Sequence, residues 1–183
     1  MRIEPKLDEI VYGKRGMLRG IEVCIKHQCL VSAVSLMFAA IDAVSALNRA
    51  IEKDDTDRSE FKKWVRDYLL PGSDLRCDES DLYAARCGVL HTYSSASRDA
   101  RNNKARHLVY RWREGPTADA DQPLPPDALE VPVESLHEAL KQAVRKFLED
   151  SEVDPDVRER VQHHLPSLLC YAPWPNLEAH VAA

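Results

Sequence analysis

The chain has 183 residues, of which 44% are hydrophobic and 30% charged, and only 6 are glycine. This composition excludes collagen-like, low-complexity and wholly disordered chains, and the length is that of one domain with its own core. The net charge of −5 excludes a generally basic coat for nucleic acid or for an anionic membrane. Any nucleic-acid site must therefore be local.

The ends and the cysteines predict a cytoplasmic protein. The first residues contain no apolar run and no cleavage site, so we expect no secretory signal. The five cysteines have neither Cys-x2-Cys nor zinc-finger spacing, which favours reduced thiols and predicts no metal and no cofactor. The apolar stretch 30–47 contains Asp42 and three serines, which favours a buried core helix over a membrane span.

The first half of the chain has the apolar period of α-helices. One helix is expected over 6–27, either continuous or broken at its glycines, and a second over about 28–50. A third begins with a capping pattern at Asp57 and carries an aromatic stripe that indicates core packing. A fourth, over about 79–94, follows an acidic opening that suits the helix dipole.

The second half predicts two short strands and two more helices. Residues 107–112 and 129–133 have strand patterns and are expected to pair back on each other across a proline-rich loop. A long amphipathic helix begins near Leu136, and the last helix begins at Asp154 with Pro155 in its first turn.

The predicted fold is therefore all-α. We expect an up-and-down bundle of five to six helices with a small β-hairpin inserted over about 106–133. The bundle forms a single domain over 1–165, and 166–183 form a C-terminal tail.

An acid in the apolar second helix requires an explanation. An ionised Asp42 in such a helix needs a cationic or multi-donor partner. Two interpretations are open, because Asp42 can bond a neighbouring backbone or can orient an arginine.

The fourth helix carries the pattern Arg86-x4-His91-x-Tyr93. This pattern resembles the Arg-x4-6-His signature of the HEPN superfamily (higher eukaryotes and prokaryotes nucleotide-binding), in the form found in HEPN toxins that pair with nucleotidyltransferase antitoxins. The acid in an earlier apolar helix fits the same resemblance, which spans about 6–165. One departure is Cys87, where family members often have a polar residue.

The resemblance implies a metal-independent endoribonuclease of a toxin or defence type, usually a homodimer. Arg86 would bind the scissile phosphate, His91 would be the general acid/base, and Asp42 would orient Arg86. These residue types suit the chemistry, because an imidazole moves protons near neutral pH and a guanidinium matches phosphate oxygens. The products would be a 2′,3′-cyclic phosphate and a 5′-hydroxyl. Tyr93 would be the tyrosine that a partner nucleotidyltransferase adenylylates, although packing is the alternative role for this side chain.

The spacing within the motif adds a geometric question. Five residues place Arg86 and His91 about 140° apart around a regular helix. Either the long arginine side chain wraps around the helix, or a second protomer supplies the other half of the site. We favour the second protomer, because an isologous interface brings both copies into one cleft.

A basic run follows the motif. Residues 86–113 contain seven Lys or Arg and one acid, as expected of a local phosphate site on an acidic body. A solvated basic loop is the alternative. The candidate RNA-binding residues are Ser95, Arg98, Arg101, Lys104 and Arg106.

Three other interpretations stay open. The chain could be a non-catalytic HEPN-like module that binds RNA, a nucleotide or a protein. It could be a structural bundle that only dimerises. Arg86 and His91 could also be ordinary partly buried polar residues that bind Asp42, Asp81 or a carbonyl.

Overall fold

The computed structural model describes residues 5–92, 97–112 and 128–168, without the side chains of residues 5 and 92. The elements of the first half are α1 (Pro5–Tyr12), α2 (Met17–Lys26), α3 (Leu30–Asn48), α4 (Arg58–Trp64), its π-helical continuation (Val65–Leu69) and α5 (Glu79–Thr92). Those of the second half are α6 (Arg98–Arg101), β1 (His107–Arg111), β2 (Ala128–Pro132), α7 (Val133–Val153), α8 (Pro155–His164) and a 3-10 turn (Leu165–Ser167). The prediction of an all-α bundle with a small β insertion is confirmed.

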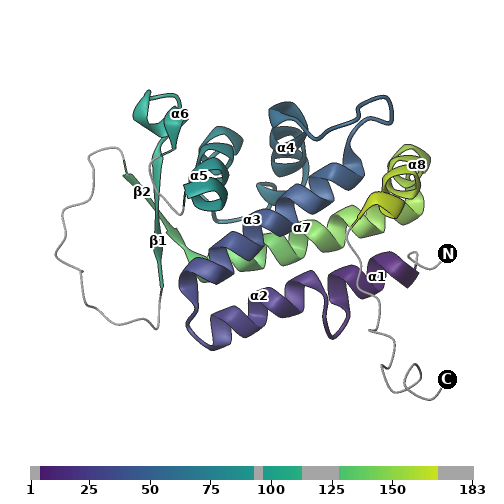
Figure 1. The fold of residues 1–183 in the computed structure, drawn as a ribbon, viewed down its shortest axis with the longest axis horizontal. Coiled ribbons are helices and arrows are strands. Elements are labelled where there is room, and N and C mark those ends of the chain that lie inside the picture. Colours follow the sequence, from purple (N-terminus) through teal and green to yellow (C-terminus); the bar gives the residue numbers. More distant parts are fainter. Residues whose placement is uncertain (1–4, 93–96, 113–127, 169–183) are drawn as a thin grey trace, which may run out of the picture.

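Helix α3 lies at the centre of the bundle. It packs against α2, α4, α5, α7 and α8, and Figure 1 shows it beside α7, with α1 and α2 along one side and α4, α5 and α8 along the other. By length and hydropathy it could cross a membrane, and half of its apolar window is buried inside the bundle; core helices of soluble proteins pass the same test. The buried residues from Leu7 to Leu165 form one hydrophobic cluster around it.

The helix starts predicted from capping residues are confirmed. The Asp57 carboxylate accepts hydrogen bonds from the backbone N–H groups of Ser59 (2.7 Å) and Glu60 (3.0 Å) at the start of α4. The Asp154 carboxylate likewise caps α8, where Pro155 occupies the first turn. These bonds satisfy amide donors that have no partner within the helix.

The first expected helix is broken into α1 and α2, which resolves the alternative that the glycines left open. A Cβ at Gly13 would lie 2.3 Å from the Glu9 carbonyl oxygen, and one at Gly16 would lie 2.8 Å from the Ile10 carbonyl oxygen. The break between α1 and α2 therefore takes this form only because both positions lack a side chain.

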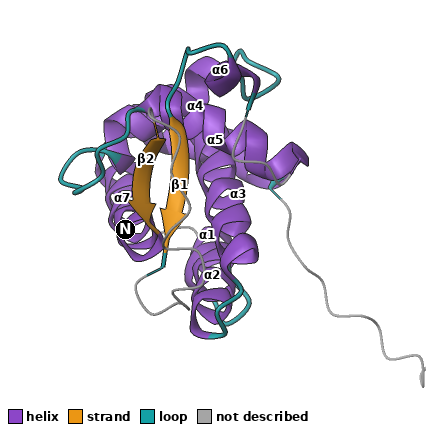
Figure 2. Ribbon diagram, turned by 90° about the vertical axis from the view of Figure 1, so that its left-hand side faces the viewer, coloured by secondary structure: helices purple, strands orange, loops and turns teal. Residues whose placement is uncertain are grey.

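The two strands pair in parallel, so the expected hairpin is wrong. His107 is opposite Ala128 and Arg111 is opposite Pro132. A parallel pair needs a connection of about a dozen residues or more, and residues 112–127 provide that length. Figure 2 shows the two strands side by side at one end of the bundle, where β1 contacts α5 and β2 contacts α7.

The aromatic stripe of the third helix lies in the core, as predicted. Trp64 and Phe61 are fully buried. The Trp64 ring stacks on Tyr68 at 5.6 Å, and Phe147 of α7 approaches both rings edge-on. This packing joins α4 and its continuation to α7, and α4 in turn contacts α5.

Candidate functional site

An aspartate on α3 and an arginine on α5 form a two-pronged ion pair. The Arg86 Nε atom lies 3.1 and 2.9 Å from the two Asp42 carboxylate oxygens, and its Nη2 atom lies 2.7 Å from Oδ2. About a quarter of each side chain is exposed, 27% for Asp42 and 24% for Arg86. Burial lowers the pKa of Arg86, but the hydrogen bonds and charge of Asp42 outweigh this and raise the pKa overall. The guanidinium is therefore a fixed, permanent cation.

The same guanidinium contacts the histidine of the motif. The Arg86 Nη1 atom lies 3.3 Å from the Nε2 atom of His91, which is exposed in the last turn of α5. A guanidinium has only donors, so Nε2 can take part in a hydrogen bond here only as the acceptor.

This contact corrects the geometric argument for a second protomer. The two residues do leave α5 in different directions, but the long arginine side chain spans the separation within one chain. A regular-helix calculation places Cβ atoms and ignores the reach of a side chain with four rotatable bonds. The alternative in which Arg86 wraps around its helix therefore holds, and the geometry no longer requires a dimer.

A cavity of about 350 Å³ adjoins the Asp42–Arg86 pair. Its walls come from α3, from α4 with the residues before it, and from α5. Arg86 lines the cavity, and its Nη1 atom contacts His91, which is not one of the lining residues. The cavity is lined by Asp42, Ala43, Ala46, Thr56, Asp57, Arg58, Phe61, Tyr83 and Arg86.

Arg58 and Tyr83 are cavity residues that the sequence analysis missed. The Arg58 Cζ atom lies 4.8 Å from the centre of the Tyr83 ring, and the Arg58 Nη2 atom lies 2.9 Å from an oxygen of Asp99 in α6. Burial raises the pKa of Tyr83, and the Arg58 charge partly opposes this rise, so the phenol is neutral. The signal for Tyr83 was its position three residues before Arg86, on the same face of α5. Arg58 had no local signal beyond its place in the α4 capping pattern.

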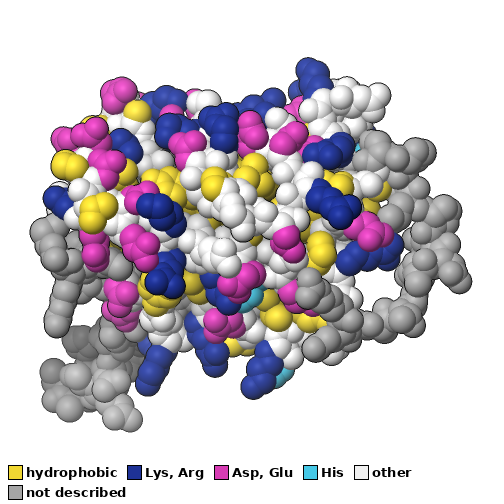
Figure 3. Space-filling view, turned by 180° about the vertical axis from the view of Figure 1, so that it is seen from behind, with side chains coloured by type: hydrophobic (Ala, Val, Ile, Leu, Met, Phe, Trp, Pro, Cys, Tyr) yellow, Lys and Arg dark blue, Asp and Glu magenta, His cyan; other side chains and the backbone are white. Residues whose placement is uncertain are grey.

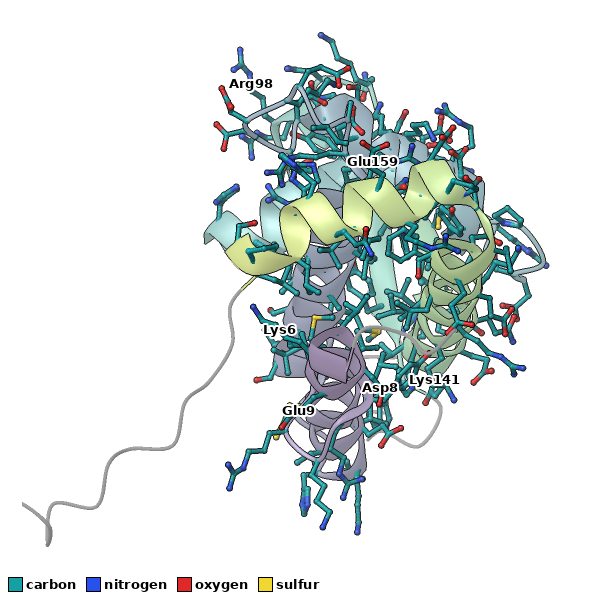
Figure 4. All side chains as sticks on the ribbon, turned by 90° about the vertical axis from the view of Figure 1, so that its right-hand side faces the viewer. Lys6, Asp8, Glu9, Arg98, Lys141 and Glu159 are labelled. Atoms are coloured by element: carbon teal, nitrogen blue, oxygen red, sulfur yellow. The ribbon has the colours of Figure 1, made fainter. Side chains whose placement is uncertain are left out.

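The predicted RNA-binding residues do not behave alike. Arg98, Arg101 and Lys104 are exposed in α6 and just after it, and Figure 4 shows Arg98 extending outward from the bundle. The Arg58–Asp99 ion pair ties this basic segment to the edge of the cavity. Ser95 and Tyr93 lie outside the described residues.

Arg106 has a different role from the one predicted. Its backbone N–H, Nε and Nη2 groups all donate to the carboxylate of Asp81, which is only 2% exposed. Its Nη2 group also donates to the Arg76 carbonyl. The side chain thus fastens the start of β1 to the start of α5, and we no longer count it among the RNA contacts, although 44% of it is exposed.

The rest of the described surface carries both signs of charge. Figure 3 shows the face opposite that of Figure 1, where basic and acidic side chains are interspersed. In the described ranges, no three His, Cys, Asp or Glu side chains gather in a way that could hold a metal ion. Cys87, which follows the motif arginine, is half-buried.

Comparisons with known proteins add no assignment. No protein-family model matches the chain, and neither the curated proteins nor the solved structures contain a match.

Proposed function

We propose that this chain is a metal-independent endoribonuclease of the HEPN type. One observation carries the proposal: a guanidinium that a buried-helix carboxylate holds by two prongs also touches the Nε2 atom of an exposed histidine. A fixed cation beside an imidazole is a pair that suits cleavage of an RNA phosphodiester. The fit between the sequence motif and this geometry supports the proposal.

The chemistry follows from these groups. When RNA binds, His91 Nε2 exchanges its contact with Arg86 for the 2′-hydroxyl and removes its proton, and the 2′-oxygen attacks the neighbouring phosphorus. Arg86 binds the phosphate oxygens as negative charge develops on them, while Asp42 keeps the guanidinium in place. The bond to the 5′-oxygen breaks, that oxygen takes up a proton, and the products are a 2′,3′-cyclic phosphate and a 5′-hydroxyl.

A homodimer is part of the proposal for a chemical reason. One imidazole can remove the first proton, and a second imidazole in the same cleft could supply the last one. A two-fold axis beside α5 would bring the two copies together. By the HEPN resemblance, the protein is a cytoplasmic toxin or defence nuclease whose antitoxin is a nucleotidyltransferase that modifies Tyr93.

The test is RNA cleavage in EDTA. We expect purified protein to cleave single-stranded or structured RNA, to leave 2′,3′-cyclic phosphate ends and to spare a strand with 2′-deoxy sugars. His91→Ala should lose about 10²–10⁴-fold in rate. His163→Ala removes another exposed histidine, on α8, and should retain the activity. Absence of any cleavage at high protein concentration, or equal cleavage by His91→Ala, would contradict the nuclease.

A second candidate is a non-catalytic module that binds RNA. The observation in its favour is that Asp42 already neutralises Arg86, and that Cys87 replaces the polar residue frequent in the family. This function predicts salt-sensitive RNA binding without product, weakened by Arg98→Ala and Arg101→Ala. The same cleavage assay separates the two candidates.

A further inference from the structure

Three cavities of similar size differ in the charges that line them. The cavity beside Asp42 and Arg86 has two arginines, whereas cavities of about 380 and 440 Å³ elsewhere have more acids than bases. The acids in those walls are Glu52, Glu60, Asp156 and Glu159 in one, and Asp74, Glu134 and Glu138 in the other. Of these three, the cavity with two arginines is therefore the one that suits an anion. A smaller cavity of about 250 Å³ is also basic, but its cations, Arg19, Lys141 and Arg145, all pair with exposed or half-exposed glutamates, and the motif residues do not line it.

The two acids in this cavity already have partners. Asp42 binds Arg86. Asp57 accepts hydrogen bonds from the Ser59 hydroxyl and from two backbone N–H groups, and the Lys53 Nζ atom lies 3.2 Å from it. These bonds, with that of Ser59 as the largest cause, lower the pKa of Asp57, so the carboxylate is ionised and bound. The bound cations and N–H groups therefore reduce the electrostatic repulsion between these two carboxylates and an incoming anion.

The second cation of the cavity, Arg58, is held in place but open to solvent. The Tyr83 ring lies against its guanidinium and Asp99 binds its Nη2 atom, yet 53% of the side chain is exposed. A guanidinium carries five N–H donors, and its ion pair with Asp99 runs through one nitrogen. Arg58 is thus placed as a fixed phosphate ligand, in the manner that Arg86 is placed by Asp42.

We propose that Arg58 binds a second phosphate, adjacent along the strand to the one at Arg86, and that the cavity receives the nucleoside between them. A volume of about 350 Å³ lies within the range of small-ligand pockets, about 300–1,000 Å³. The substrate class is therefore an oligonucleotide with at least two phosphates. This inference rests on the proposed function, because it takes the Arg86 phosphate as its reference point.

The experiment uses a probe that the proposed chemistry cannot cleave. The thymidine dinucleotide d(TpT) lacks 2′-hydroxyl groups and has one phosphate, whereas d(pTpT) and d(TpTp) carry a second one at the 5′ or the 3′ end. Their dissociation constants are measured by calorimetry at low salt in EDTA. We expect one of the two longer probes to bind about tenfold more tightly than d(TpT), since a charge-assisted hydrogen bond is added.

Arg58→Gln should abolish this gain while d(TpT) still binds. Arg66→Gln is the matched control, because Arg66 is 57% exposed and also pairs with one carboxylate across elements, that of Glu79. Asp99→Asn removes the ion pair and keeps the arginine, so it should retain the gain. A role for Arg58 that is only to hold α6 predicts the same loss in Asp99→Asn and Arg58→Gln, and that result would overturn the inference.

The outcomes also distinguish this inference from the proposed nuclease. A second-phosphate gain that depends on Arg58, in a protein that cleaves no RNA, supports the subsite and contradicts the nuclease. RNA cleavage that depends on His91, with no gain from either added phosphate or with the full gain in Arg58→Gln, contradicts the subsite alone.

Discussion

Helix α5 takes part in two aspartate–arginine pairs whose carboxylates differ in burial, although Arg106 (44% exposed) is more open to solvent than Arg86 (24%). Asp81 is 2% exposed and accepts four hydrogen bonds, three of them from Arg106. The Asp42–Arg86 pair is about a quarter exposed, adjoins a cavity and touches His91.

The difference shows how one pair type serves two purposes. The Asp81 carboxylate is enclosed by donors from two elements, so it fastens those elements together and leaves little room for a ligand. Asp42 holds one edge of the Arg86 guanidinium, and another edge faces a histidine and an open cavity. Surroundings, and not residue type, therefore separate a structural pair from a candidate site.

The largest expected effect is on stability at the enclosed carboxylate, Asp81. Asp81→Ala should lower the free energy of unfolding by about 3 kcal/mol, because it removes a buried acceptor of four hydrogen bonds and leaves the backbone N–H groups of Asp78 and Arg106 without it. Asp42→Ala should lower it by about 1 kcal/mol, since that pair is partly solvated. Urea denaturation of both variants measures this difference, and equal losses would erase the distinction between the pairs.

The next effect is on RNA cleavage at the open pair. Arg86→Lys keeps the charge but loses the planar fork, so we expect a 10²–10³-fold lower rate with a nearly unchanged free energy of unfolding. Arg106→Lys, at concentrations where it is folded, should lose much less rate and more stability. A rate loss in Arg106→Lys that matches that of Arg86→Lys would return Arg106 to the site.

A smaller kinetic effect is expected from the carboxylate that holds Arg86. Asp42→Asn preserves the shape but replaces a charged acceptor by a neutral one, so the guanidinium is less firmly held. We expect about a tenfold lower cleavage rate. Single-turnover kinetics on one RNA substrate measures it. An Asp42→Asn rate equal to that of the unaltered protein would mean that Asp42 does not position Arg86.

The smallest effect concerns His164, a buried histidine that contrasts with the exposed His91. Burial lowers the pKa of His164, and the charges of Arg49 and His163 add to this. The unfolded chain has the ordinary value of about 6.5, so it binds more protons below that pH, and the free energy of unfolding falls as the pH drops from 7 through 6.5.

This one group should contribute a slope of at most about 1.4 kcal/mol per pH unit. His164→Gln should flatten the pH dependence measured by urea denaturation between pH 7 and 5. His163→Gln changes the exposed neighbour and should keep most of the slope. A steeper decline in His164→Gln would give the opposite sign and contradict the assignment.

The helix caps and the amphipathic helices of this protein were predictable because they depend on residues close together in the sequence. The caps at Asp57 and Asp154 satisfy amides two and three residues away, and the apolar period marks the buried face of the amphipathic helices α2 and α7. The ion pair between Asp42 and Arg86, 44 residues apart, was one of two interpretations that the sequence left open, because an acid in a buried helix needs a donor.

Other features were beyond the sequence. The strands were expected to form a hairpin, yet they pair in parallel, because strand patterns do not encode direction when the connection is long. The basic run counted Arg106 as available, although Asp81, 25 residues earlier, binds it. The Arg58–Asp99 contact, which draws α6 to the cavity, joins two segments without any shared motif.

The sequence by itself determined most of the helices, two of their caps, the aromatic core stripe and the motif residues, since each depends on neighbours within one or two turns. Only the tertiary structure decided which carboxylate is enclosed and which is partly exposed, that Arg86 meets His91 within one chain, and that Arg58 lies beside Tyr83 at the same cavity. Those outcomes depend on how helices distant in the sequence pack around α3, and a side chain's remaining donors are fixed only once that packing is complete.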